Sequence, residues 1–194
     1  MFWNGRPGAL HRDVKRCLTI ACLVSGWLAP VWCATLERLS MDDMIAKSTA
    51  IVRGTVSNSW TTFTGRDIFT HYSVQVAERF KGATQASVEI TVQGGTYGAY
   101  HQTPSGVPVL NKGDQYVFFL WTSPSGVTWI TGMTQGLFVM DGGQAADPVA
   151  TRAATRELML DPSTARPVKD SAISFKLSDL RSRISTRLNQ GVAK

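Results

Sequence analysis

Cysteine is scarce in this chain, and all of it lies near one end. Only three of the 194 residues are cysteines, and Cys17, Cys22 and Cys33 all fall within the first 34 residues. The rest of the chain therefore has no disulfide framework, no thiol nucleophile and no cysteine-based metal site. A domain of about 160 residues without these devices depends on its hydrophobic core, and that length is enough to bury one.

The usual signatures of catalysis and metal binding are also missing. The sequence has no Gly-x-Ser-x-Gly elbow, and Gly94-Gly95-Thr96 lacks the Gly-Lys pair of a phosphate loop. His71 and His101, the histidines after residue 34, lack the close spacing that zinc sites favour. We therefore predict no catalytic residue, no metal and no cofactor. A Ser-His-Asp array stays open as an alternative, because geometry defines it.

Charge is low and unevenly distributed. Charged residues make up 18% and hydrophobic residues 43%, which excludes a disordered chain. The net charge of +6 divides into +3 for residues 1–34, −2 for residues 35–149 and +5 for residues 150–194. Because the middle of the chain is slightly acidic, nucleic acid is an unfavoured partner. The basic C-terminal segment is where contact with an acidic surface is expected.

Residues 1–34 have the pattern of a secretory signal. Basic residues precede an uncharged run at 17–29, and Val31 and Cys33 are small enough for a signal-peptidase site. We expect cleavage after Cys33 and an exported protein, either periplasmic or secreted. The alternative is an uncleaved membrane anchor, because the uncharged run reaches Leu36 and borders on spanning length.

Beyond the predicted signal, the hydrophobic pattern indicates a short helix followed by strands. Ser40 and Asp43 have the spacing of a capping box for a helix over 41–48. The period then changes to two, and Gly54 marks a bulge inside the first strand. The run YVFFLW is apolar on both faces, which is typical of a buried central strand. Turns rich in Gly, Pro, Asn and Asp separate six predicted strands, at 50–56, 68–77, 88–93, 116–121, 128–131 and 137–140.

After Met140 the strand pattern stops. Proline interrupts residues 146–176, where a short helix over 149–160 is expected. An amphipathic, basic helix is predicted over about 178–190, with Ser178 as its cap. We expect this helix to pack on the strands, and the alternative is that it docks to a membrane or a partner. Its apolar stripe is Leu177, Leu180, Ile184 and Leu188.

These elements predict a mainly β fold. The strands would form an antiparallel, OB-like barrel of about six strands, with a short N-terminal helix and a C-terminal amphipathic helix. The connections are too short for intervening helices, which disfavours a βαβ fold. We predict a signal peptide at 1–34, a β-barrel domain at 35–145 and a basic segment at 146–194.

Four stretches in this order carry a resemblance, namely Ser48–Val56, Tyr72–Glu78 with Lys81-Gly82, Gly113–Leu120 and Gln135–Val139. Together they resemble a family of exported bacterial domains of unsettled function. They are also similar to the OB-like barrel of netrin-type modules and tissue inhibitors of metalloproteinases. Those inhibitors chelate the zinc of their target with a mature N-terminal cysteine. Here a start at Cys33 would need cleavage after the bulky Trp32, so the resemblance does not imply protease inhibition.

The irregular stretch 97–110 holds the candidate binding residues Tyr97, Tyr100 and His101. Long loops on rigid β scaffolds often carry function. We interpret the chain as a non-enzymatic exported domain that binds a protein partner or an envelope surface, with membrane contact through the C-terminal helix or an uncleaved leader left open. The alternatives are a hydrolase of unrecognised type and OB-type nucleic-acid binding.

Overall fold

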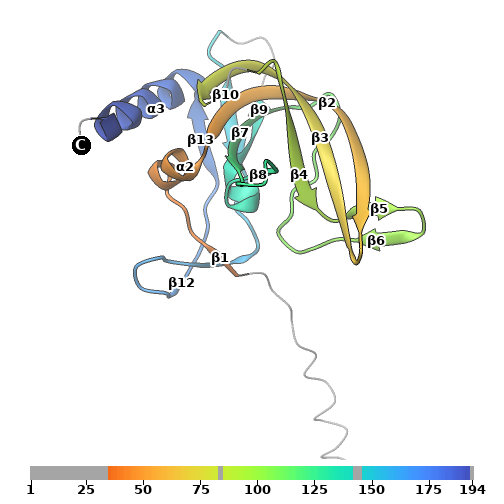
Figure 1. The fold of residues 1–194 in the computed structure, drawn as a ribbon. Helices are drawn as coiled ribbons and strands as arrows, with labels where there is room; N and C mark the ends of the chain where they lie inside the picture. The colour runs from red at the N-terminus through yellow and green to blue at the C-terminus, as the bar shows by residue number, and fades with distance from the viewer. Residues whose placement is uncertain (1–34, 83–84, 142–145, 193–194) are drawn as a thin grey trace, which may run out of the picture. The chain divides into compact units, whose positions relative to one another are not determined.

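An eight-stranded sheet organises the part of the chain that the computed structural model describes, which is residues 35–82, 85–141 and 146–192 (Figure 1). The predicted signal peptide lies outside these described residues. The strands follow the order β13-β10-β9-β7-β2-β3-β4, and β8 pairs with β7 off this path. Their bounds are β2 (Ala50–Thr64), β3 (Asp67–Lys81), β4 (Ser87–Gln93), β7 (Gln115–Thr122), β8 (Thr128–Ile130), β9 (Leu137–Asp141), β10 (Val149–Arg152) and β13 (Ile173–Lys176).

Strand β7 is buried on both faces, as its sequence predicts. Its side chains alternate between two separate cores. Tyr116, Phe118 and Leu120 belong to a core that lies inside the curl of β2, β3, β4 and β7. Val117 and Phe119 face the opposite side and belong to a second core, together with Phe138 and Ala150. Because side chains of a strand alternate between its two faces, a strand that is apolar at every position needs a hydrophobic core on each face, and β7 has both.

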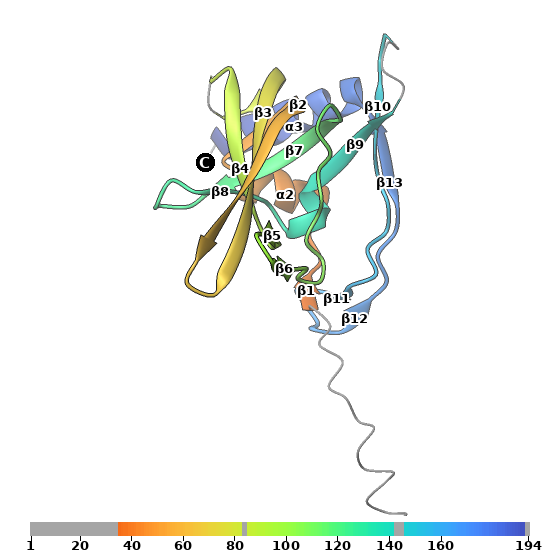
Figure 2. The same ribbon diagram turned by 90° about the vertical axis from the view of Figure 1, so that its right-hand side faces the viewer.

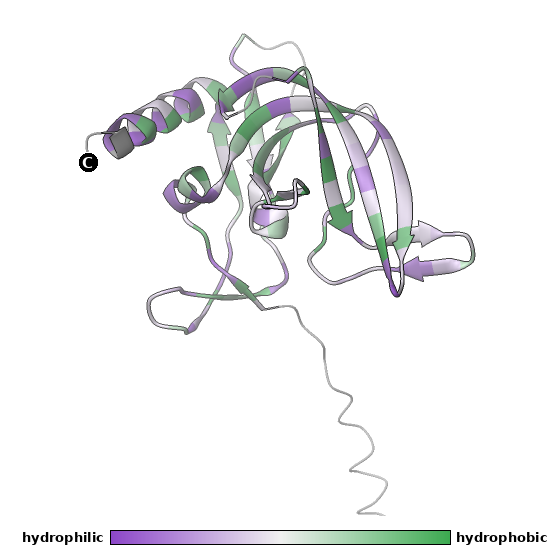
Figure 3. Cartoon of the chain, viewed as in Figure 1, coloured by the Kyte–Doolittle hydropathy of each residue, from purple (hydrophilic) through white to green (hydrophobic). Residues whose placement is uncertain are grey.

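Two helices cover the second core. Helix α2 (Met41–Lys47) contributes Met44 and Ile45, and α3 (Leu177–Val192) contributes the buried side chains Leu177, Leu180 and Ile184. Figure 3 shows the apolar residues of α3 interleaved with hydrophilic ones along the helix. The predicted apolar stripe of the C-terminal helix therefore packs mostly against the sheet. Arg183 also pairs with Asp42 of α2 at 2.9 Å.

The start of each helix follows from local hydrogen bonds. The predicted capping box of α2 is confirmed, because the Asp43 N–H donates to Ser40 Oγ at 3.1 Å and the Ser40 N–H donates to Asp43 Oδ2 at 3.1 Å. The cap predicted for α3 is wrong, because the helix already begins at Leu177. The carboxylate of Asp147 accepts from the N–H and the hydroxyl of Ser178 instead.

The predicted bulge at Gly54 is confirmed. The register between β2 and β3 shifts between Arg53 and Gly54. A Cβ at this glycine would lie 2.5 Å from Val74 Cγ1 and 2.6 Å from the carbonyl oxygen of Gln75. A residue without a side chain therefore allows β2 and β3 to approach closely where the hairpin bends.

The fold is mainly β, but the predicted OB-like barrel of about six strands is not confirmed. The sheets are open: within the described ranges β4 pairs with β3 alone, at one end of the strand order, and β13 lies at the other end. Figure 2 shows β13 and β10 side by side, away from β4. The sheet stays open because β10 and β13 extend it past β9, where the sequence pattern predicted its last strand.

The short helix predicted over 149–160 is wrong. This stretch forms β10 and then β11 (Leu158–Leu160). In β10 the buried residues Ala150 and Arg152 alternate with the half-buried Val149 and Thr151, which is the period of a strand. The sequence conceals the pattern because one of the inward-facing residues is an arginine.

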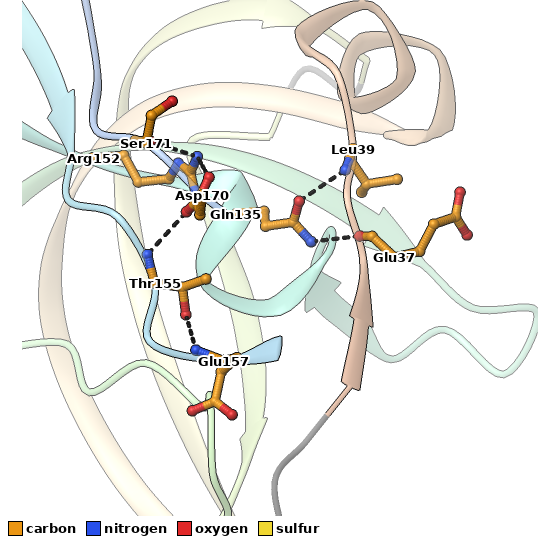
Figure 4. Close-up of polar contacts among 8 residues, drawn as sticks. All are labelled: Glu37, Leu39, Gln135, Arg152, Thr155, Glu157, Asp170 and Ser171. Atoms are coloured by element: carbon orange, nitrogen blue, oxygen red, sulfur yellow. Dashed lines mark hydrogen bonds and ion pairs between the residues drawn. The ribbon is translucent and has the colours of Figure 1, made fainter. Parts of the chain in front are cut away.

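A second, three-stranded sheet joins the start of the described chain to residues 158–168. Strand β1 (Thr35–Glu37) pairs in parallel with β11, and β11 pairs with β12 (Pro167–Val168). The side chain of Gln135 holds the end of β1, as Figure 4 shows. Its Oε1 accepts from the N–H of Leu39, and its Nε2 donates to the carbonyl of Glu37, both at 2.9 Å. Gln135 lies in the 3₁₀ turn Met133–Gly136 and is buried.

Candidate functional site

Two hairpin turns meet at one end of the sheet (Figure 1). The β2–β3 hairpin turns at Gly65-Arg66, and the small hairpin of β5 (Gly95–Tyr97) and β6 (Tyr100–Gln102) turns at Gly98-Ala99. Gly65 and Gly98 have φ values of +66° and +57°, which glycine adopts without strain. The predicted irregular stretch after residue 97 therefore begins as a short, paired hairpin.

Three exposed aromatic rings gather on these turns, and we call them the aromatic tip: Phe63, Tyr97 and Tyr100. Phe63 stacks on Tyr97 with ring centroids 5.8 Å apart and on Tyr100 with centroids 5.7 Å apart. The exposed fractions of the three residues are 40%, 47% and 65%, respectively. Aromatic rings that stack on one another while remaining open to water form a ready contact surface.

Hydrogen bonds lock the two hairpins together. Gln102 Oε1 accepts from the N–H of Ile68, and Gln102 Nε2 donates to the carbonyl of Arg66, both at 2.7 Å. The hydroxyl of Thr61 donates to the carbonyl of Thr96 at 2.9 Å. These bonds join β6 and β5 to both strands of the longer hairpin, so they fix the aromatic tip in place.

Gly95 allows this close approach. Its φ is +130°, and a Cβ at this position would lie 2.3 Å from the hydroxyl oxygen of Thr70. That hydroxyl donates to the carbonyl of Gly94 at 2.7 Å. The Gly94-Gly95 pair thus serves to bring β5 against β3.

The structure brings two of the three predicted binding residues into one cluster. Tyr97 and Tyr100 lie opposite each other in the β5–β6 ladder. His101 is the next residue along, and its two ring nitrogens lie 2.8 Å from the hydroxyl oxygens of Thr96 and Thr103. This histidine therefore has hydroxyl partners at both ring nitrogens and does not stack with the rings of the tip.

Phe63 is the member of the tip that sequence reasoning missed. It stands in the run WTTFT, directly before the turn at Gly65-Arg66. A large aromatic residue next to a tight turn is a weak signal, because the same pattern also occurs where the ring is buried. Only the pairing of the second hairpin shows that Phe63 lies against two tyrosines.

A pocket of about 340 Å³ adjoins the β5–β6 hairpin. The loop after β6 forms its other wall. Its lining is mostly apolar and includes Tyr72, Val92, Pro104 and Val109, of which Val109 is 75% exposed. The pocket therefore shares the β5–β6 hairpin with the aromatic tip, although none of the three tip residues lines it.

A polar array on β2, β3 and β4 surrounds the other histidine. His71 Nε2 lies 2.8 Å from Thr62 Oγ1, and His71 Nδ1 lies 2.9 Å from Glu89 Oε1. Trp60 stacks on the imidazole with centroids 5.4 Å apart and an interplanar angle of 9°. The array has the order hydroxyl, imidazole, carboxylate, which sequence reasoning could not assemble because it joins three strands.

In the described ranges, no group of three or more His, Cys, Asp or Glu side chains could hold a metal ion. No helix among the described residues combines the length and the apolar content needed to cross a membrane.

Comparisons with protein families, with characterised proteins and with solved structures find no match to this chain.

Proposed function

We propose that this chain is an exported, non-enzymatic binding module that engages a protein partner through the aromatic tip. The observation that carries the proposal is the stacked, exposed triad of Phe63, Tyr97 and Tyr100 on two cross-linked hairpins. Tyrosine and phenylalanine are enriched at protein interfaces, and tyrosine is one of the residue types that dominate binding energy.

Rigidity adds to the argument. A partner that binds mobile aromatic side chains must first order them, which costs about 0.5–1.5 kcal/mol for each flexible side chain. Gln102 and Thr61 already hold the two hairpins together, so much of this cost is met during folding. A surface organised before binding is better suited to recognition than to solubility alone.

Export is part of the same proposal. The signal pattern of residues 1–34 supports it. Cleavage after Cys33 would retain every helix and strand among the described residues. The absence of cysteine after residue 33 also means that the fold does not depend on the redox state of the compartment.

The test compares partner capture by three forms of the chain. Replacing Phe63, Tyr97 and Tyr100 together by alanine should lower the affinity for a partner captured from an envelope extract by at least tenfold, because such residues commonly contribute 2 kcal/mol or more. The control is Val139→Ala, which removes an apolar side chain that is 47% exposed but lies outside the tip. Equal recovery of the same proteins by all three forms would contradict the proposal.

A second candidate function, hydrolysis of an ester, is favoured by the array of Thr62, His71 and Glu89. A hydroxyl within reach of an imidazole that a carboxylate orients is the arrangement of an activated nucleophile. On this reading, His71 takes the proton of Thr62 Oγ1 as the oxygen attacks the ester carbonyl, and gives it to the leaving alcohol as the ester C–O bond breaks. Water, deprotonated by His71, then attacks the acyl-threonine, which releases the acid and returns the proton to Thr62.

The enzymatic candidate makes a separate prediction. His71→Gln should abolish hydrolysis of p-nitrophenyl acetate, whereas His101→Gln should leave it unchanged, because His101 has hydroxyl partners but no carboxylate partner. The release of p-nitrophenolate measures the rate. If both variants and the unmodified chain react no faster than buffer, the chain is not an esterase.

A further inference from the structure

A second pocket, of about 500 Å³, lies between the segment before α2, the strands β10 and β13, and α3. Leu39, Met41, Ile173 and Phe175 supply its apolar lining. The same four residues pack against the core behind them, which makes this wall firm. The pocket shares no residue with the aromatic tip.

Charged residues that are buried also line this pocket. Arg152 donates to Asp170 through two bonds, Nη1 to Oδ2 at 2.8 Å and Nη2 to Oδ1 at 2.9 Å. The side chains of this pair are only 7% and 4% exposed, respectively. Arg152 Nε is buried and has no acceptor among the described residues. A buried donor without an acceptor is costly, and a ligand oxygen could satisfy it if a small shift of the Arg152 side chain turned Nε toward the pocket.

Two charged groups of opposite sign that keep unpaired atoms among the described residues complete the lining. The guanidinium of Arg38 has no hydrogen bond or ion pair with the described part of the chain, although its backbone pairs with Leu160. Asp161 Oδ1 accepts four bonds from Ser163 and Thr164, which leaves Oδ2 without a partner in the described ranges. The hydroxyl bond from Ser163 is the main reason that the pKa of Asp161 falls to about 2, so this carboxylate is charged at neutral pH.

The other charged residues of the pocket are already paired. Arg183 bonds to Asp42, and Asp43 caps α2 by accepting from Ser40. The groups left to meet a ligand are therefore one guanidinium, one buried Nε–H, one carboxylate oxygen and an apolar wall. A simple anion bound by the arginines would be repelled by the carboxylate of Asp161. A simple cation bound by Asp161 would leave Arg38 and Arg152 Nε without an acceptor.

We propose that this pocket binds a small zwitterion with an apolar side chain, which is the chemistry of a free α-amino acid. Its carboxylate accepts from Arg38 and from Arg152 Nε, and its ammonium donates to Asp161 Oδ2. Its side chain packs on Ile173, Phe175 and their neighbours. Polar and charged residues outnumber the apolar ones in this lining, and charged groups that converge beside an apolar wall suit a small ligand that carries both charges.

The first test uses leucine and two derivatives of it, measured by isothermal titration calorimetry on the full chain. Leucine should bind with one-to-one stoichiometry. Leucinamide lacks the carboxylate and N-acetylleucine lacks the ammonium, so each should bind at least tenfold more weakly. Glycine, which has both charges and no side chain, should also bind more weakly.

Arg38 and Asp161 allow a matched pair of substitutions, one for each charge of the ligand. Arg38→Gln should weaken leucine binding about tenfold and leave the affinity for leucinamide unchanged. Asp161→Asn keeps an oxygen for the turn formed by Ser163 and Thr164. It should weaken the binding of leucine and leave the affinity for N-acetylleucine unchanged. Arg166→Gln, which removes a charge that does not line the pocket, serves as the control. The proposal is overturned if leucine gives no saturable heat at millimolar concentration, or if the Arg38 and Asp161 variants bind it as the control does.

Discussion

Replacing Asp170 by alanine is expected to lower the free energy of unfolding by about 3–5 kcal/mol, because it leaves a buried guanidinium without its counter-charge. Arg152 and Asp170 are 7% and 4% exposed, respectively, so little of their surface is open for water to replace the lost partner. Asp170 also accepts from the N–H of Thr155 at 2.9 Å, and that donor loses its acceptor as well. Urea denaturation at neutral pH measures the change.

Two further variants show whether burial is the cause. Asp42→Ala breaks an ion pair of similar length, Arg183 to Asp42 at 2.9 Å, but both side chains are about half exposed. Its cost should stay within about 1 kcal/mol. The double variant Arg152→Met with Asp170→Leu should be more stable than Asp170→Ala, because it removes both buried charges. Equal losses for Asp42→Ala and Asp170→Ala would contradict this account.

The same pair gives stability a defined dependence on pH. Burial of the Asp170 carboxyl acts to raise its pKa, but the hydrogen bonds from Arg152 and Thr155 and the charge of Arg152 outweigh burial and lower the pKa below its ordinary value of 3.8. The stability that this group contributes is therefore fully present well above pH 3.8 and is lost as the pH falls through the lowered pKa. The difference in unfolding free energy between the unmodified chain and Asp170→Asn should accordingly shrink below that pH.

Phe138→Ala should have the second large effect, with a loss of about 3–5 kcal/mol in the free energy of unfolding. Phe138 is fully buried between the rings of Phe119 and Phe175, with centroids 5.7 Å and 4.9 Å away. Its removal leaves a cavity where β9 and β7 meet β13, and the surrounding strands cannot collapse to fill it.

The matched control for this prediction is Phe63→Ala. The change in the side chain is the same, but Phe63 is 40% exposed and belongs to the aromatic tip. Its loss should change stability by about 1 kcal/mol or less while it weakens partner binding. If thermal or urea unfolding ranks the two variants in the opposite order, the assignment of core and tip is wrong.

Much of the central architecture could be predicted because local patterns determine it. The Ser40–Asp43 capping box, the bulge at Gly54 and the doubly buried run at 116–121 each depend on residues that are close in sequence. In these stretches the intrinsic propensity, the hydrophobic period and the turn residues all favour the same secondary structure. Such agreement is what allows an element to be predicted from sequence.

The remainder depends on partners that are distant in sequence. Strands β10 to β13 are two to four residues long, too short to show a period, and β10 buries an arginine whose partner lies at position 170. Whether a sheet closes is decided by which strand meets its edge, and no local pattern encodes that choice. Tyr97 and Tyr100 could be identified as candidates, but their contact with Phe63 requires the pairing of two separate hairpins.

The parallel pairing of β1 with β11 also has a consequence for the order of events during synthesis. Thr35 pairs with Leu158, more than one hundred residues later in the chain. Strand β1 cannot find its neighbour until nearly all of the chain has left the ribosome, and closing so long a loop is slow. The strand that follows the predicted leader is therefore among the last to be fixed.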